Sequence, residues 1–309
     1  MKTILLTSAV FFATRKTSAL ASLLIILTVL SVPYSAQETK KITVNDLSLT
    51  YLERGSGPMI ILIHGSVSDY REWVKQIGPL AQHYRVVAYS RRFHWPNARQ
   101  GKDADARVER QVDDLAALVR TLGSTPSHII GHSFGGAVAL NFALRYPELV
   151  RTLVLIEPAV SSVLADTPEN REATKEGQAI RAKLKEAFES GDAQRIVRTY
   201  AEHVAPGEFD KATTEFREML TANVQAFQLD FTSPRPVLSC DDAQKVSVPV
   251  LVLSGDRSPL GLQRIAEATA NCIPKARLIK IRGATHWVQH DHGEELNAAL
   301  LAFLASHRR

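Results

Sequence analysis

A lone serine set among glycines, in the stretch Gly131–Gly136 (GHSFGG), constrains the fold of this chain more than any other feature. The apolar run Ser127–Ile130 precedes it and the alanine-rich run Ala137–Glu148 follows it, which predicts a strand, a sharp turn and a helix. Such a turn leaves little room for side chains at Gly131 and Gly135, because the strand and the helix approach closely. The serine at the apex is then strained, with its hydroxyl exposed beside the first amides of the helix.

Apolar runs that predict strands alternate with segments of helical spacing along most of the chain. The predicted strands are a hairpin over Lys41–Gly55 that turns at Asn45 and Asp46, followed by Met59–Gly65, Tyr84–Ser90, Ser127–Ser133, Arg151–Pro158, Val248–Gly255 and Ala276–Gly283. The predicted helices include Trp73–Gln82, Val108–Gly123 and Glu294–His307. This alternation predicts an α/β fold, with a mainly parallel twisted sheet and helices on both faces.

Residues 160–245 break this alternation, since they are charged, rich in helix formers and without a strand-like run. We interpret the segment as a helical insertion between two core strands. Open α/β sheets bind ligands at the carboxyl ends of their strands. The insertion is therefore expected to form a cap over that end of the sheet.

The first 36 residues differ from the rest of the chain in charge and hydropathy. They hold three basic residues and no acidic one, and the apolar stretch Ala19–Val32 is followed by small residues near Ala36, although Tyr34 is large for a cleavage site there. This order is typical of a signal peptide, and an uncleaved membrane anchor is the alternative, although the stretch is short for a spanning helix. We expect a leader over 1–36, an exported protein and a domain over 37–309.

Much of the positive charge belongs to this leader, because the formal net charge of +5 falls to +2 once residues 1–36 are removed. The rest of the chain has no basic run and no nucleic-acid-binding motif. The expected partner is a small-molecule substrate and not nucleic acid. Membrane contact is expected only through an uncleaved leader, and the oligomeric state is left open.

The two cysteines, Cys240 and Cys272, are compatible with a disulfide in an exported protein and equally with two free thiols. The sequence does not tell whether their Cβ atoms approach. No group of histidines and cysteines has the spacing of metal ligands. We expect neither a metal nor a cofactor.

The chain resembles the α/β-hydrolase superfamily, and within it the capped serine hydrolases, over Lys41–Arg309. The resemblance rests on Ile63–Ser66, the turn Gly131–Gly135 (the elbow), the end of Val248–Asp256, and Gly283–Trp287. It implies an esterase- or lactonase-like enzyme with Ser133 as its nucleophile. A serine hydroxyl needs a base to take its proton.

His286 is the base that the resemblance implies, among ten histidines, because it lies just past the last predicted strand. His290 and His292 are the competing residues in the same stretch. In related hydrolases the amide after His-Gly forms half of the oxyanion hole, which here is Ser66, with Val67 second. The amide after the nucleophile, that of Phe134, forms the other half.

His64, in the same His-Gly stretch, is expected to fix the loop by hydrogen bonds rather than to transfer protons.

The acid that orients the base is where the chain departs from the family. Most relatives carry it at the position of Ser258, which cannot supply a charge, while Asp256 lies two residues earlier. Some relatives, including certain haloalkane dehalogenases, place it where Glu157 ends an apolar strand, and a carboxylate in that setting is costly unless paired. Glu157 and Asp256 both remain candidates, with Asp241, Asp242 or no acid as further alternatives.

The nucleophile limits the chemistry that the resemblance allows. Haloalkane dehalogenases and epoxide hydrolases of this fold use aspartate where this chain has Ser133. Hydrolysis of a carboxylic ester or lactone fits best. The same groups also serve carbon–carbon bond hydrolysis, amide hydrolysis, acyl transfer to an alcohol and cofactor-free perhydrolysis. Outside the enzymes, the alternative is a non-catalytic binding protein of this fold.

The substrate pocket is expected between the core and the segment 160–245. Phe134, Trp73 and Trp287 are candidate lining residues, with core packing as the alternative for each. Arg91 and Arg92 follow a predicted strand, where they either meet an anionic group or, the interpretation we favour, form solvated salt bridges.

Overall fold

A computed structural model describes residues 38–97 and 105–308. The predicted leader, residues 1–36, lies outside the described residues. Within the described ranges, the helices are too short or too polar for any of them to cross a membrane.

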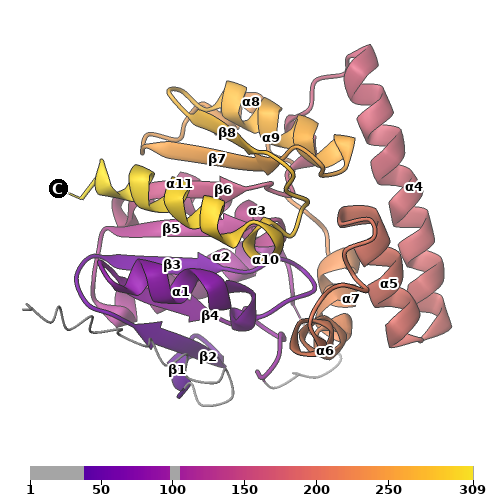
Figure 1. Ribbon diagram of the computed structural model, residues 1–309. Coiled ribbons are helices and arrows are strands. Elements are labelled where there is room, and N and C mark those ends of the chain that lie inside the picture. The colour runs from indigo at the N-terminus through magenta and orange to yellow at the C-terminus, as the bar shows by residue number, and fades with distance from the viewer. Residues whose placement is uncertain (1–37, 98–104, 309) are drawn as a thin grey trace, which may run out of the picture. The chain divides into compact units, whose positions relative to one another are not determined.

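The core is an eight-stranded sheet in the order β1-β2-β4-β3-β5-β6-β7-β8 (Figure 1). Its strands are β1 (Lys40–Val44), β2 (Leu47–Arg54), β3 (Met59–Ile63), β4 (Arg85–Tyr89), β5 (Ser127–His132), β6 (Val150–Ile156), β7 (Val250–Gly255) and β8 (Arg277–Ile281). The hairpin β1–β2 and the pair β2–β4 are antiparallel, and all other pairs are parallel. The predicted α/β class and mainly parallel sheet are confirmed.

The turn of the hairpin lies where the sequence predicts it. Asn45 has a φ of 50°, in the left-handed region that asparagine tolerates better than most residues. The strands behind the hairpin are continuous apolar runs, and every residue of β3 is buried. Strands covered on both faces need no polar alternation, which is why the sequence shows none there.

Helices cover both faces of the sheet (Figure 1). They are α1 (Val74–Ala81, after the short helix η2 at Tyr70–Trp73), α2 (Val108–Leu122), α3 (Phe134–Arg145, followed by η3 at Pro147–Leu149), α9 (Leu260–Cys272), α10 (Val288–Asp291) and α11 (Gly293–Ala305). Residues of α2, α3 and α9 share one apolar core with one face of the sheet, while α1 and α11 pack against each other on the opposite face. Helix α9 is the one long helix here that the sequence prediction lacked.

Between β6 and β7 the chain forms η4 (Ser161–Val163), α4 (Pro168–Ser190), α5 (Ala193–Val204), α6 (Thr214–Ala222), α7 (Val224–Thr232) and α8 (Cys240–Ala243). Helices α4 to α7, which we call the helical insertion, lie together beside one end of the sheet (Figure 1). They have their own apolar cluster, which includes Leu184, Tyr200, Leu220 and Phe227. Trp287, from the turn after β8, packs in the same cluster and so anchors the insertion to the core.

Cys240 and Cys272 form a disulfide, with Cα atoms 5.1 Å apart. The bond joins the start of α8 to the end of α9, so it fixes the point where the chain returns from the insertion to the sheet. Of the two states that the sequence left open, the structure contains the paired one.

Candidate active site

Ser133 forms the apex of a sharp turn between β5 and α3. Its φ of 52° and ψ of −117° lie outside the regions that residues with a side chain prefer. A Cβ atom at Gly131 would overlap the carbonyl group of Gly135, and one at Gly135 would overlap the carbonyl groups of Ile63 and His64. Glycine at both positions is thus required, and the packing around the turn holds the strained serine in place.

His286 follows β8 and is paired with Glu157. Its Nδ1 donates a hydrogen bond to Glu157 Oε2 over 2.6 Å, and both side chains are 1% exposed. The backbone amide of His286 donates to the Val204 carbonyl at the end of α5, over 3.3 Å. The histidine is therefore oriented by an acid from the sheet and held by a contact with the helical insertion.

Glu157 follows β6 in a second strained conformation, with a φ of 43°. Its Oε1 accepts hydrogen bonds from Ser254 Oγ and from the Gly255 amide, each over 2.8 Å. Burial alone would raise the pKa of Glu157, but hydrogen bonding and charge from His286, together with Ser258 and Ser254, hold the pKa below its usual value. The buried carboxylate is thus ionised and fully engaged.

Asp256, the other candidate acid, points elsewhere. Its carboxylate is exposed and accepts a hydrogen bond from the Gly283 amide over 2.6 Å, which braces the turn after β8. Asp242 closes a capping box at the start of α8 with Ser239. Of the acids that the sequence left open, the structure brings Glu157 and not Asp256 to His286. Glu157 follows β6 and Asp256 follows the neighbouring strand β7, and it is the end of β6 that lies beside the histidine.

Burial is the main reason that the pKa of His286 is lowered from its usual value of 6.5, and the nearby His132 lowers it further. Glu157 and, more weakly, Glu72 act in the opposite direction. The balance keeps the ring neutral near pH 7, which is the state that a general base requires.

Two backbone amides border the serine, as the resemblance implies. Ser66 follows β3 and lines the same cavity as Ser133 and His286, and Phe134 is the first residue of α3. Within the described part of the chain, neither amide has a hydrogen-bond partner. Both donors are free to meet an oxygen at this point.

His64 has the fixing role that the sequence analysis expects. Its Nδ1 donates to the Gly65 carbonyl over 2.7 Å, and its Nε2 accepts from the Arg91 amide over 2.9 Å. Burial lowers the pKa of His64 well below its usual value, so the ring is neutral and both nitrogens are occupied.

Arg91 and Arg92 are buried rather than solvated. Arg91 pairs with Asp230 of α7 over 2.7 Å and Arg92 with Asp114 of α2 over 2.7 Å. The predicted salt bridges are present, but in the interior, where neither arginine meets the cavity that holds Ser133.

A cavity of about 410 Å³ contains Ser133, Ser66 and His286. Helices α4, α5 and α7 of the insertion supply much of its wall, including Ile180, Leu184, Tyr200 and Phe227. The lining residues suggested by the sequence are not among those that border it. Trp73 is fully buried, Phe134 packs in the core, and Trp287 borders a different, smaller cavity.

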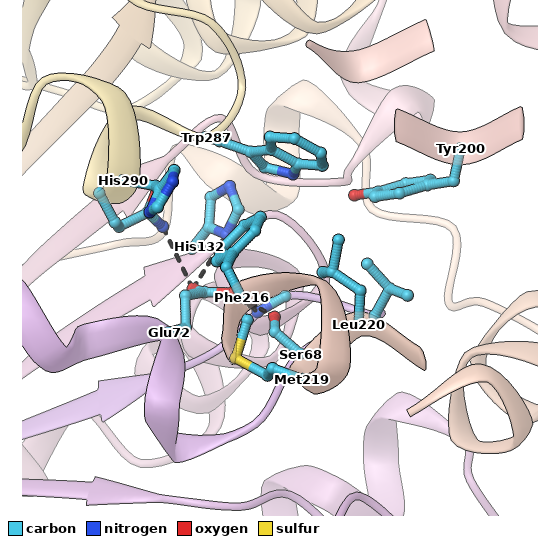
Figure 2. A pocket seen from close by; sticks show the side chains of 12 residues that line it. Ser68, Glu72, His132, Tyr200, Phe216, Met219, Leu220, Trp287 and His290 are labelled. Atoms are coloured by element: carbon cyan, nitrogen blue, oxygen red, sulfur yellow. Dashed lines mark hydrogen bonds and ion pairs between the residues drawn. The ribbon is translucent and has the colours of Figure 1, made fainter. Parts of the chain in front are cut away.

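The smaller cavity holds about 10 Å³, which is at most the room of one water molecule. It borders a second histidine–carboxylate pair, in which His132 Nδ1 lies 3.0 Å from Glu72 Oε1 (Figure 2). His132 Nε2 donates to the backbone carbonyl of His286 over 3.0 Å. Both ring nitrogens of His132 therefore face oxygen atoms, one of Glu72 and one of the backbone.

Glu72 is satisfied by four donors, since the Ser68 hydroxyl, the Gly65 amide and the Gln289 side chain join His132. These contacts tie the loop after β3, the elbow and the turn after β8 to one buried carboxylate. The pair was not predicted, because Glu72 lies 60 residues from its partner and in no recognisable motif.

Tyr200 of α5 is another site residue that the sequence did not indicate. Burial and the negative charges of Glu72 and Glu157 raise the pKa of its hydroxyl, while a hydrogen bond with Ser133 acts the other way. The hydroxyl therefore stays protonated beside the serine. Nothing in its surroundings in the sequence distinguishes it from an ordinary residue of an amphipathic helix.

Comparisons with known proteins agree with this architecture. A family model described as alpha/beta hydrolase fold matches residues 58–293. A 2-(acetamidomethylene)succinate hydrolase from Mesorhizobium japonicum is 24% identical over 268 residues, which cover 86% of this chain and 95% of that protein. Epoxide hydrolase 4 from Mus musculus is 23% identical over 275 residues, covering 83% of this chain and 75% of that protein. Among solved structures, a thermophilic esterase from Thermogutta terrifontis aligns with a TM-score of 0.71 and 24% identity, over 88% of this chain and 100% of that one.

Proposed function

The chain belongs to the α/β-hydrolase family and is a hydrolase, and we propose that it cleaves a carboxylic ester or lactone of a small molecule through an acyl-enzyme on Ser133. The observation that carries the proposal is the buried His286–Glu157 pair at the cavity that contains Ser133. Nucleophile, orienting acid and base follow one another in the chain as Ser133, Glu157 and His286, each after the end of a strand.

In the proposed reaction His286 Nε2 takes the proton of Ser133 as its Oγ attacks the substrate carbonyl. The proton then passes to the leaving alcohol as the carbon–oxygen bond breaks, which leaves an acyl-enzyme. A water molecule attacks the acyl group, gives its proton to His286, and the acid departs as Ser133 is restored. Glu157 holds the ring with Nδ1 protonated and stabilises the positive charge that develops on it.

The amides of Ser66 and Phe134 are the proposed oxyanion hole. A negative charge develops on the carbonyl oxygen during the attack, and preorganised donors at that place stabilise it without reorganisation. Their position beside Ser133 and their lack of other partners in the described part of the chain support this role.

Ser133 separates the proposed reaction from that of the epoxide hydrolase relative. An alkyl-enzyme ester forms on a carboxylate nucleophile, and no carboxylate stands at the elbow of this chain. Carbon–carbon bond hydrolysis, acyl transfer to an alcohol and perhydrolysis share the acyl-enzyme, so substrate profiling separates them from ester hydrolysis. A ligand-binding protein without turnover would hydrolyse no activated ester.

Two further parts of the proposal concern location and access. We propose that the helical insertion is a cap, since three of its helices wall the cavity.

We also propose that the protein is exported, for which the Cys240–Cys272 disulfide gives support, because such bonds persist in oxidising compartments. N-terminal sequencing of the protein from the culture medium or periplasm would test the leader.

Labelling with a fluorophosphonate, followed by mapping of the adduct by mass spectrometry, tests the nucleophile. We expect modification at Ser133 alone, and none in Ser133→Ala, because the probe reacts with a serine activated by a base. A folded protein that is not labelled would contradict the proposal and point to a binding role. Screening of the unlabelled protein with simple activated esters would follow.

A further inference from the structure

Arg235, in the segment after α7, borders the large cavity that contains Ser133. Its guanidinium carbon lies 5.3 Å from the centre of the Phe134 ring, and Phe134 is the residue next to the nucleophile. Within the described residues, no carboxylate lies within ion-pair distance of Arg235, and no hydrogen bond engages its side chain. The arginine is a cation without a partner at the site.

Arg181 of α4 is a second arginine on the cavity wall. Its guanidinium carbon lies 4.4 Å from the ring centre of Phe231, and its one hydrogen bond is a long one, 3.5 Å, to the Phe231 carbonyl. By contrast, Arg171 and Arg198, also on the insertion, form ion pairs with Asp166 and Asp210. Neither of the two arginines that border the cavity has an ion pair among the described residues.

The other ionisable groups of the wall do not neutralise these arginines. Glu176 accepts a hydrogen bond from the Gly261 amide over 2.7 Å and forms no ion pair among the described residues. Burial lowers the pKa of His203, so that this ring is neutral near pH 7. Arg235 is an exposed residue, but the protein atoms around its guanidinium lower its pKa. Asp230 opposes this shift, while Arg181 and Arg91 add to it.

We propose that Arg235, with Arg181 farther along the wall, forms a subsite for a carboxylate of the substrate. The inference rests on the proposed function and adds that the ester or lactone carries a free carboxylate. A guanidinium presents parallel N–H donors that match a carboxylate, and a partly desolvated, unpaired arginine gains most from such a partner. The same cavity is also lined by apolar side chains, which include Leu184 and Phe227 and which suit the carbon chain of such a substrate.

The test compares two substrates with acyl chains of equal length, mono-4-nitrophenyl glutarate and 4-nitrophenyl valerate. The wild-type protein should have a kcat/KM at least about tenfold higher for the glutarate ester, since a charge-assisted hydrogen bond is worth that much or more. In Arg235→Gln the ratio of the two values should fall about tenfold, and Arg235→Lys should retain part of it. Arg198→Gln is the matched control, because this arginine is exposed and paired away from the cavity, and it should leave the ratio unchanged.

The outcomes separate the subsite from the reaction. Hydrolysis of both esters with a ratio that Arg235→Gln does not change would overturn the carboxylate subsite and leave the proposed function standing. Hydrolysis of neither ester, with no labelling of Ser133, would overturn the proposed function. If Arg235→Gln does not fold, inhibition of the wild-type protein decides the matter: glutarate should compete with the valerate ester at least about tenfold more tightly than glutaramide, and equal inhibition would overturn the subsite.

Discussion

Two buried histidine–glutamate pairs lie side by side in this protein, and only one of them is built for catalysis. The rings of His286 and His132 are 4.5 Å apart, and each has a glutamate within 3.0 Å of its Nδ1. They differ in what the other ring nitrogen meets. His132 Nε2 is occupied by the backbone carbonyl of His286, whereas His286 borders the cavity that contains Ser133.

The difference shows that a carboxylate partner orients a histidine without making it a base. A base needs a free nitrogen at the reacting group and a ring that is neutral at working pH. His132 has no free nitrogen, since its ring is held between Glu72 and the turn that carries His286. The His132–Glu72 pair, which we call the brace, holds the site in place. The His286–Glu157 pair performs the proton transfer that we propose.

The largest difference between the pairs should appear on replacing the two histidines by glutamine. We expect His286→Gln to lower kcat on an activated ester by about 10⁵–10⁶, because the proton acceptor is lost. His132→Gln should lower kcat by only about 10- to 100-fold, through misplacement of the His286 turn. Steady-state kinetics of both variants measure this, and an equal loss in the two would mean that His132 also takes part in proton transfer.

The next effect concerns the orienting acids. Glu157→Gln should lower kcat by about 10³–10⁴ with the fold intact, since its amide oxygen still accepts from Ser254 and Gly255 while the charge is lost. Asp256→Asn serves as the control and should stay near the wild-type rate, because Asp256 contacts a turn amide only. Full activity of Glu157→Gln would refute the assignment of the acid.

Breaking the brace should lower the stability of the protein more than its catalytic rate. Glu72→Gln is expected to lower the free energy of unfolding by about 3–5 kcal/mol, because it breaks the buried pair with His132. Urea unfolding followed by fluorescence measures this, with exposed Glu294→Gln as the control. A loss no greater than that of the control would show that the pair is dispensable for folding.

The contribution of the Glu72 carboxylate to the free energy of unfolding depends on pH in a defined way. Burial would raise the pKa of Glu72, but the charge and hydrogen bond of His132 hold it below its usual 4.5. A group with a depressed pKa in the folded state stabilises the protein above its unfolded pKa, and this contribution is lost as the pH falls through the folded pKa. The stability gap between wild type and Glu72→Gln should therefore narrow below about pH 4.5.

The smallest expected effect is a shift in the acid limb of the pH profile of kcat/KM. On this limb kcat/KM falls with falling pH, because His286 becomes protonated. His132 contributes to the lowered pKa of His286, so His132→Gln should raise that pKa. Glu157→Gln should move the limb the other way, because the carboxylate stabilises the protonated ring. Shifts in the same direction in the two variants would contradict the opposite effects of His132 and Glu157 on the pKa of His286.

Much of this arrangement is readable from the chain alone because it depends on local patterns. The apolar runs mark the strands of the sheet, and the glycines of the elbow mark a turn in which a Cβ atom has no room at Gly131 or Gly135. The position of His286 after the last strand also follows from strand order. Such features are set by neighbouring residues, and so by backbone geometry that the sequence specifies directly.

The sequence left the acid open between Glu157 and Asp256 because β6 and β7 are adjacent, and the carboxyl end of either could supply a carboxylate to the same histidine. Tyr200 and Arg235 belong to the site only through the way in which the insertion packs on the sheet. The brace joins Glu72 to His132 and to the turn that carries His286, across most of the chain. The sequence by itself determined the sheet, the elbow and the type of nucleophile, whereas the tertiary structure decided the acid, the brace and the cavity wall, because these depend on contacts between distant segments that no local pattern records.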